Sequence, residues 1–522
     1  MNTLIKDLAH PKRISIFWWI AFILAVIGIN IYTVSQTPKW SEKYITAFIL
    51  GNICIFVSAA FIYFLYQIAK FLPSLSNEKH IKFYRVSFIV LIFALFVFPF
   101  ILIIHVPDSA HNWDFFEVFN LTSQLHGTSF QNLPMTENER LYFLRYANNQ
   151  FFGLLYNHIF APFNTTAKIW LATFISAIFT TISVMAGSLL IKKISNVKMA
   201  LMYNLVAFGF LPFYLYGAEL YTDTASLPFA ILGVLFTVYA IKSDSTKKQV
   251  LWWIVDGTVI FFGYYIKPTV AIPLVAAVLF LIINKKWKKL IIMLPLSVIL
   301  FLGMHEVVNL TIATEPAFSQ KNNNRYNMPL MHWITMSFAP KNHWGGFDSN
   351  ILAYSESFTN KSAKQAGDIK LFVSNLKKQG IPGVILQLCR KISYTWFNGD
   401  LGDFFYTYHH QNPFIAKYFD WTKLNPSEGN VTGWILIKAA QTLLWIFMVP
   451  LMWYEIALSV FKKYKTEWFI LGLSIAGLSG FLLIWEANSR YLYNFAPIII
   501  IMAVRGLFDL LERKVPKNEL PK

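Results

Sequence analysis

Long apolar runs alternate with short polar connectors along most of this chain. Each run has roughly 18 to 25 residues, which as a helix crosses about 30 Å of hydrocarbon. We predict about twelve membrane spans, near residues 14–34, 44–68, 86–105, 168–191, 199–217, 225–241, 251–266, 268–284, 290–310, 434–460, 467–485 and 490–508. The pattern therefore predicts an all-α polytopic membrane protein.

Basic residues gather in alternate connectors, and this spacing predicts the orientation of the chain. The basic connectors contain Lys6, Lys12 and Arg13; Lys70, Lys79, Lys82 and Arg85; Lys192, Lys193 and Lys198; Lys242, Lys247 and Lys248; Lys285, Lys286, Lys288 and Lys289; Lys462, Lys463 and Lys465; and Arg513 and Lys514. If the spans alternate in direction, all of these connectors lie on one side, which the positive-inside rule assigns to the cytoplasm. We expect a multi-pass protein of the cell membrane with both termini cytoplasmic.

Two long segments then lie on the opposite, external side. One is 106–167, and the other is 311–433, which has ordinary polar composition and is large enough for a small extracytoplasmic domain of mixed or mainly helical structure. The last helices, in 434–522, return to the membrane.

The composition indicates that lipid surrounds part of the protein. Of 522 residues, 56% are hydrophobic and only 14% are charged, too few to cover the apolar surface of a soluble protein. The net charge of +18 lies in the connectors and forms no basic face, so nucleic acid is excluded as a partner. Cys54 and Cys389 lie far apart, which argues against a disulfide framework and a structural zinc site.

Two aspartates in the first external segment are candidate general bases. Asp108 and Asp114 follow closely on the end of a span, among aromatic residues that include Trp113, Phe115 and Phe116. A partly desolvated carboxylate has a raised pKa and can accept a proton from a hydroxyl near neutral pH. The alternative is that both aspartates are solvated loop residues or helix caps.

The same segment resembles a known family. The run Asp114…Gly127…Tyr142-Phe143…Tyr146-x-Asn-Asn-Gln-x-x-Gly is similar to the first-loop signature of GT-C glycosyltransferases, in particular the bacterial, often Gram-positive, relatives of dolichyl-phosphate-mannose-protein mannosyltransferases. By its spacing Asp114 matches the catalytic loop aspartate of that family, although Asp108 is not excluded. Ala147 stands where the family has proline. The resemblance implies a GT-C-like core at 86–310 and an added N-terminal transmembrane hairpin at 1–85.

Two further charged residues lie near external span ends. Asp223, in Tyr221-Thr222-Asp223, matches a similar acidic segment of the family, and it could assist Asp114, orient the acceptor or cap the next span. Lys267 interrupts an apolar stretch, where it could hold the phosphate of a carrier lipid or extend towards water. A divalent cation, Mg²⁺ or Mn²⁺, held by the two carboxylates stays open, but we expect no metal site because no metal-binding pattern is present.

The mouth of the last span carries Glu486, Arg490 and Tyr491, and the family often has similar residues there. Arg490 could bind a phosphate through its planar guanidinium, with Tyr491 beside it. The alternative is a helical ion pair between Glu486 and Arg490 at i,i+4 spacing.

Aromatic and amide side chains suit the faces and hydroxyls of sugars. Tyr146, Asn149 and Trp333 are candidates for binding substrate, together with Glu486. Most aromatic residues of the external segments equally suit anchoring at a membrane interface.

The resemblance implies an inverting transfer of a hexose from a polyprenyl-phosphate sugar to an extracytoplasmic glycan acceptor, with Asp114 as the base. A donor-making glycosyltransferase and a flippase would then serve the same pathway. The rival interpretation is a transporter or flippase of lipid-linked sugars, which would place its polar residues mid-span along a path. A membrane scaffold without chemistry leaves the acidic first loop unexplained.

Overall fold

The computed structural model of the protein describes residues 67–68, 76–103, 113–136, 139–340, 344–402 and 431–514, and all regular structure in these ranges is helical. The first half contains α4 (Asn77–Ile103), α5 (Trp113–Leu125), η2 (Phe130–Asn132), α6 (Arg140–Arg145), η3 (Ala147–Asn149), α7 (Gln150–Phe160), α8 (Thr165–Ile194), α9 (Val197–Gly209), α10 (Pro212–Tyr216), α11 (Thr222–Lys242) and α12 (Thr246–Ile266). The second half contains η4 (Pro268–Ala271), α13 (Ile272–Ile283), α14 (Trp287–Ala313), η5 (Pro316–Phe318), α15 (Gln320–Tyr326), α16 (Leu330–Ser337), α17 (Ser349–Glu356), α18 (Lys361–Trp396), α20 (Val431–Phe461), α21 (Trp468–Ile484), η9 (Ser489–Phe495) and α22 (Ala496–Lys514).

Ten helical segments in the described residues correspond to predicted spans. Seven are long and apolar enough to cross a membrane: Asn77–Ile103, Thr165–Ile194, Thr222–Lys242, Thr246–Ile266, Trp287–Ala313, Ala440–Phe461 and Ser489–Leu511. Three are shorter apolar helices: Val197–Gly209, Pro268–Ile283 and Trp468–Ile484. The prediction of an all-helical, multi-pass architecture is thus confirmed for these residues, while the predicted span 14–34 and nearly all of 44–68 lie outside them.

The fifth predicted span is wrong as a single helix. The sequence predicts it at 199–217, but α9 ends at Gly209 and α10 begins at Pro212. Proline has no backbone N–H to donate and is tolerated at a helix start, so Pro212 begins a new helix where it would have broken a continuing one. The chain therefore bends before it reaches α11.

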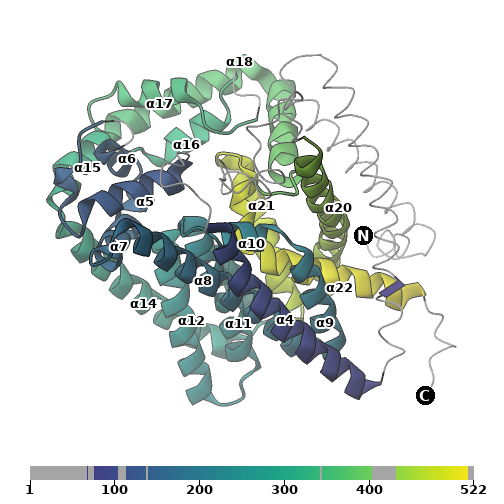
Figure 1. Ribbon diagram of the computed structural model, residues 1–522. Coiled ribbons are helices and arrows are strands. Elements are labelled where there is room, and N and C mark those ends of the chain that lie inside the picture. The colour runs from purple at the N-terminus through teal and green to yellow at the C-terminus, as the bar shows by residue number, and fades with distance from the viewer. Residues whose placement is uncertain are drawn as a thin grey trace.

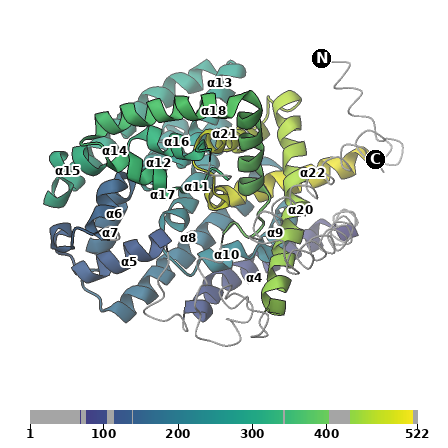
Figure 2. The ribbon, with the colours of Figure 1, turned by 90° about the horizontal axis from the view of Figure 1, so that it is seen from above.

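Burial separates a central from a peripheral layer. The segment Ser489–Leu511 is 89% buried inside the protein over its most apolar window, whereas the corresponding window of α14 is only 11% buried. Helix α11 packs against α8, α12 and η9 and lies near the middle of the bundle (Figure 2). The exposed apolar side chains of α14, such as Ile291 and Ile299, therefore face lipid.

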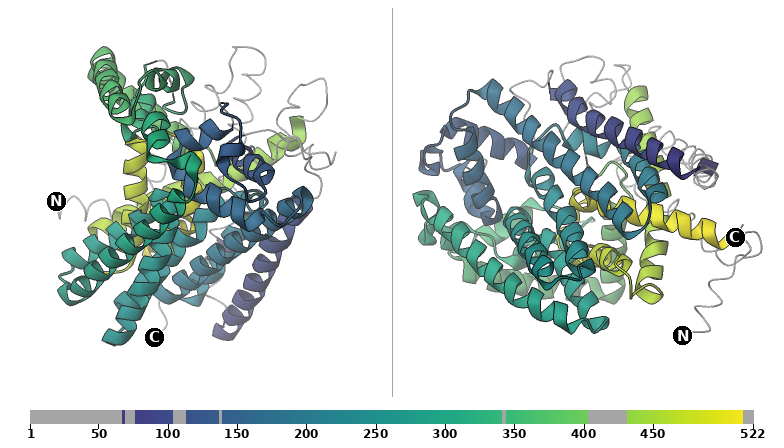
Figure 3. Two further views of the ribbon diagram at one scale, coloured as in Figure 1. Left: turned by 90° about the vertical axis from the view of Figure 1, so that its left-hand side faces the viewer. Right: turned by 90° about the horizontal axis from the view of Figure 1, so that it is seen from below.

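The helices of the two long segments gather at one end of the bundle, here called the loop end (Figures 1 and 3). Helices α5–α7 come from the first segment and α15–α18 from the second, so the described part of 311–433 is helical. The long α18 is interrupted at Gly380, whose φ of 62° is a left-handed conformation that favours glycine. After this kink, its second half runs back towards α21 and η9.

The orientation of the chain in the membrane is a prediction that labelling tests. In a background with Cys54→Ser and Cys389→Ser, a thiol at the exposed position 324 of α15 should react with a membrane-impermeant maleimide added to intact cells. A thiol at the exposed position 288, at the start of α14, should react only after the membrane is permeabilised, because this connector is basic. The reverse pattern would overturn the assignment of the two sides.

Candidate functional site

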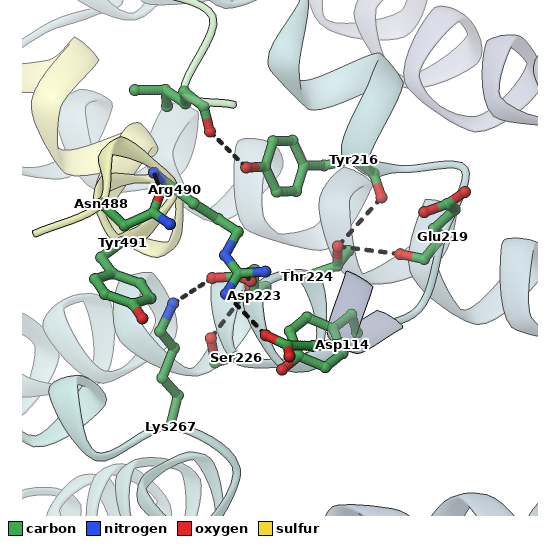
Figure 4. Close-up of polar contacts among 12 residues, drawn as sticks. Asp114, Tyr216, Glu219, Asp223, Thr224, Ser226, Lys267, Asn488, Arg490 and Tyr491 are labelled. Carbon is green, nitrogen blue, oxygen red and sulfur yellow. Dashed lines mark hydrogen bonds and ion pairs between the residues drawn. The ribbon is translucent and has the colours of Figure 1, made fainter. Parts of the chain in front are cut away.

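Four charged side chains from four separate segments meet where helices begin or end. Asp114 is in the first turn of α5, Asp223 in the first turn of α11, Lys267 between α12 and η4, and Arg490 in η9 (Figure 4). We call these four residues the charged cluster. The structure therefore brings together four of the residues that the sequence singled out.

Local sequence explains how two of these side chains are aimed. Lys267 precedes Pro268 and is extended, with φ −150° and ψ 112°, as residues before proline usually are. Asn488 precedes η9, and its side-chain oxygen accepts a hydrogen bond of 3.0 Å from the backbone N–H of Arg490. This cap fixes the backbone from which the arginine projects.

Asp223 is the centre of the cluster. Its Oδ1 is paired with Lys267, and its Oδ2 lies 3.5 Å from Nε of Arg490. Arg490 also donates from Nη2 to Oδ2 of Asp114 over 3.2 Å. One carboxylate thus holds two cations, and one of those cations holds a second carboxylate, so the cluster balances two positive with two negative charges.

Exposure differs sharply within the cluster. The side chain of Asp223 is 1% exposed and that of Arg490 7%, whereas Asp114 is 36% exposed. Burial lowers the pKa of Lys267, and the neighbouring Asp223 opposes this shift. Asp114 is therefore the member of the cluster that a molecule from outside can reach most directly.

Aromatic rings line the two cations. The ammonium of Lys267 lies 5.0 Å from the ring centre of Tyr491, and the guanidinium of Arg490 lies 5.5 Å from that of Tyr221 and 5.7 Å from that of Tyr491. Such cation–π contacts stabilise the charges away from bulk water. The hydroxyl of Tyr491 donates to Oε2 of Glu486 over 3.2 Å.

Glu486 is buried beside the cluster. Burial raises the pKa of its carboxyl to about 7, while Arg490 opposes this shift. The interpretation of Glu486 and Arg490 as an i,i+4 helical pair is wrong, because residues 486–488 are not helical and the guanidinium contacts the two aspartates. Its raised pKa makes Glu486 a group that changes charge near neutral pH.

The candidate sugar-binding residues lie next to the cluster. Asn149 is buried and donates to the hydroxyl of Tyr142 over 2.7 Å, and that hydroxyl lies 3.5 Å from the hydroxyl of Tyr221. The ring of Tyr146 lies 5.6 Å from that of Trp333, which stacks at 5.8 Å on Trp485. The three half-buried rings, from three segments, form what we call the aromatic ladder.

Sequence reasoning missed a carboxylate close to Asp114. Glu117 lies three residues after Asp114 on α5, and its pKa is raised to about 7 by burial and by the negative charge of Asp114. The i,i+3 spacing on a predicted helix was the available signal. Asp108, the second candidate base, lies outside the described residues.

Asp223 should be essential for stability, because its removal leaves two buried cations without their shared partner. We expect Asp223→Asn to destabilise the protein by about 3–5 kcal/mol, the range for breaking a buried ion pair. The measurement is the heat-dependent loss of monodisperse protein in detergent.

The matched control is Asp244→Asn, at an exposed position just beyond the other end of α11, which should change stability little. Adding Lys267→Met to Asp223→Asn should recover part of the loss, because one unpaired charge is removed. Equal stability of the two aspartate variants would show that Asp223 is not the centre of the cluster.

Comparison with solved structures gives distant similarities. The oligosaccharyltransferase AglB from Archaeoglobus fulgidus, in complex with an inhibitory peptide and a dolichol-phosphate, is 12% identical with a TM-score of 0.40, over 85% of this chain and 53% of that one. The apo form of the oligosaccharyltransferase from the same organism is 11% identical with a TM-score of 0.40, over 84% and 51%. This chain thus spans about half the length of the archaeal enzymes. ArnT from Cupriavidus metallidurans, bound to undecaprenyl phosphate, is 11% identical with a TM-score of 0.31, over 83% of this chain and 78% of that one.

One sequence-family model matches most of the chain. No curated protein matches the chain. A family model described as a conserved hypothetical integral membrane protein matches residues 10–507, and the chain therefore belongs to this family of integral membrane proteins.

Proposed function

We propose that this protein is a membrane-embedded glycosyltransferase that transfers a hexose from a polyprenyl-phosphate sugar to a hydroxyl of an extracytoplasmic acceptor, such as a cell-wall polymer, surface glycan or glycolipid. The observation that carries the proposal is the charged cluster: two cations and a reachable carboxylate, held together at the ends of membrane helices. A donor with an apolar tail in the membrane and an anionic phosphate needs cations at the ends of membrane helices. The acceptor hydroxyl needs a base beside them.

Lys267 and Arg490 would bind the carrier phosphate. Arg490 offers a planar fork that can donate two parallel hydrogen bonds to phosphate, and Lys267 adds a compact charge on the other side of Asp223. Both cations are largely buried, so their attraction for an anion is weakened less by water than at an open surface. Tyr491 would support them through its ring, since its hydroxyl is engaged by Glu486.

Phosphate binding would also free the base. In the structure Oδ2 of Asp114 accepts a hydrogen bond from Nη2 of Arg490, so this oxygen is occupied before the donor binds. A phosphate that takes over Nη2 of Arg490 displaces Asp114 and adds a negative charge nearby. The carboxylate is then free to accept a proton from the acceptor hydroxyl when the donor is in place.

The proposed transfer is a single displacement at the anomeric carbon. The acceptor oxygen attacks the anomeric carbon of the sugar and its proton passes to Asp114, while the bond from the anomeric carbon to the phosphate oxygen breaks. The electron pair of that bond stays on the phosphate, whose added negative charge Arg490 and Lys267 stabilise. Attack from the face opposite the phosphate inverts the anomeric configuration. Asp223 takes no proton and holds both cations in place.

The aromatic ladder would hold a sugar ring. Tyr146, Trp333 and Trp485 offer apolar faces for the C–H side of a pyranose, and they lie near Glu486. The indole N–H group of each tryptophan is a hydrogen-bond donor that could bind a sugar hydroxyl. Asn149 would act through Tyr142, to which it donates.

The cluster does not fit a divalent cation. Asp114 and Asp223 already hold the guanidinium of Arg490, and Asp223 holds an ammonium as well. Two fixed positive charges next to the carboxylates would repel a cation and favour an anion. The described residues also contain no group of three or more His, Cys, Asp and Glu side chains suited to a metal ion. We therefore propose a transfer in which lysine and arginine stabilise the leaving phosphate.

A protein with this function depends on two other proteins of the same pathway. The donor must be made by an enzyme that joins a sugar to polyprenyl phosphate, and it must be moved to the external leaflet by a flippase. If the protein were itself a transporter or flippase of lipid-linked sugars, the charged cluster would bind donor without transferring its sugar. Measuring binding and transfer separately distinguishes the two functions.

Arg490→Lys should impair donor use although the charge is kept, because the bidentate geometry is lost. We expect about a tenfold weaker binding of undecaprenyl phosphate to the purified protein, and more for Arg490→Ala, since hydrogen bonds to charged groups contribute about 1.5–3 kcal/mol each. Microscale thermophoresis in detergent gives both affinities. If both variants bind like the unaltered protein, Arg490 does not hold the phosphate and its role is structural.

Asp114→Asn should abolish chemistry while sparing donor binding. The amide cannot accept the proton, and a positioned base contributes roughly 10²–10⁴-fold in rate. Undecaprenyl phosphate should bind equally or more tightly, because Asp114 no longer competes for Arg490. The assay is sugar transfer from native lipid-linked donor in reconstituted membranes, with Asp244→Asn as the matched control.

Asp108→Asn is made in parallel and should be milder. If Asp108→Asn is inactive and Asp114→Asn is active, the base is the other loop aspartate and the enzyme proposal stands. If Asp114, Asp108 and Asp223 can each be replaced by asparagine without loss of transfer, the glycosyltransferase proposal falls and donor movement should be assayed instead.

A further inference from the structure

The short segment 484–489, which joins α21 to η9 and leads into Arg490, is tied to the loop-end helices along its whole length. Four hydrogen bonds make the connection: Ser337 Oγ to Ile484 O (3.0 Å), Lys391 Nζ to Trp485 O (2.7 Å), Ala487 N to Gly345 O (2.7 Å) and Asn398 Nδ2 to Ser489 Oγ (3.3 Å). We call this set the clamp. Its members outside the segment come from α16, from the turn before α17, and from α18 and its C-terminal end.

Lys391 is the charged member of the clamp. Its side chain lies on the second half of α18, and the residue is 1% exposed. Besides Trp485 O, its ammonium donates to Ser337 Oγ over 2.8 Å and lies 4.6 Å from the ring centre of Phe338. Burial lowers the pKa of Lys391 to about 7, and the nearby Glu486 opposes this shift. Burying a lysine so deeply costs free energy unless its ammonium has partners. Here the partners are the backbone carbonyl just after α21 and the hydroxyl of Ser337 on α16.

The surroundings of Lys391 are closely fitted. A Cβ at Gly345 would lie 2.8 Å from Ser337 O and 3.0 Å from Cγ of Lys391, so only glycine fits there, and its φ of 70° favours glycine as well. One turn before Lys391, Gln387 donates to Ser337 O over 3.0 Å. Residues of α16, of α18 and of the turn before α17 therefore fit closely around Lys391, whose ammonium is buried among them.

We propose that Lys391 is a positioning residue for the carrier phosphate: it fixes the segment 484–489 and, through it, the direction of the Arg490 guanidinium. The inference rests on the proposed function, because it concerns the phosphate site. Trp485, Glu486 and Asn488 all belong to the segment that Lys391 holds, and Asn488 in turn bonds the backbone N–H of Arg490. A shift of the segment by 1 Å would move Trp485 of the aromatic ladder and the guanidinium together.

The first test is Lys391→Met, which keeps the apolar stem and removes the ammonium. With purified full-length protein and undecaprenyl phosphate as the probe, we expect about tenfold weaker binding. The reason is that the guanidinium of Arg490 would no longer be held in the direction that suits the phosphate. The matched control is Lys378→Met on the exposed face of the same helix, which should bind like the unaltered protein. Unchanged affinity in a well-folded Lys391→Met protein would overturn the proposal.

A double-mutant cycle separates positioning from general stability. If Lys391 acts through Arg490, then Lys391→Met should weaken binding in the unaltered protein but change it little when Arg490→Ala is already present. An equal loss in both backgrounds would mean that Lys391 contributes independently of Arg490, and the proposal would be wrong. If Arg490→Ala itself leaves phosphate binding unchanged, the proposed function fails, whatever the lysine variant does.

A milder variant covers the case in which Lys391→Met does not fold. Ser337→Ala removes one hydroxyl that accepts from Lys391 and donates to Ile484 O. We expect about a threefold weaker affinity, again only when Arg490 is present, from the loss of these hydrogen bonds. An additive effect, or none, in this second cycle would count against the clamp.

Discussion

The rest of the structure depends on one buried carboxylate. Asp223 is 1% exposed, and such a charge is tolerated only with partners that replace its water. Lys267 and Arg490 are those partners, one on each oxygen. Because they come from the end of α12 and from η9, the first turn of α11 must lie between these two elements. Both α11 and Ser489–Leu511 lie in the buried centre of the bundle.

The two aspartates share Arg490 but differ in exposure. Asp223 is enclosed, with a cation on each oxygen, and is suited to hold the cations. Asp114 is 36% exposed, accepts from Arg490 at 3.2 Å and sits at the start of a helix that belongs to the first long loop. In the proposed reaction this asymmetry divides the work, because the enclosed carboxylate holds the two cations while the exposed one accepts the proton of the acceptor hydroxyl. A cluster of two equally buried carboxylates could not separate these roles.

The sequence predicted the helical architecture and the members of the charged cluster better than it predicted their contacts. Apolar length and basic connectors locate membrane helices because lipid imposes a strong and simple constraint. Lys267 and Asp223 are 44 positions apart, and nothing in their local sequence announces that they pair. The supposed pair of Glu486 and Arg490 assumed a helix, whereas Asn488 caps a new one between them. The buried Lys391 was beyond local reasoning, since in sequence it lies beside Arg390 in a polar helix and its partners are in α16 and after α21.

In the proposed reaction one guanidinium, that of Arg490, serves both the carrier phosphate and the base. Competition is reciprocal, so whatever strengthens the contact of Asp114 with Arg490 weakens phosphate binding to the same degree. In the proposed reaction, donor binding frees Asp114, and the transfer then protonates it. The neutral carboxyl no longer competes for Arg490, so the newly charged carrier phosphate is held most tightly at this point. When Asp114 loses that proton to water, it is an anion again and competes with the phosphate for Nη2. Loss of the proton would thus promote release of the spent carrier, and the contact at 3.2 Å in the structure is the state to which the site returns.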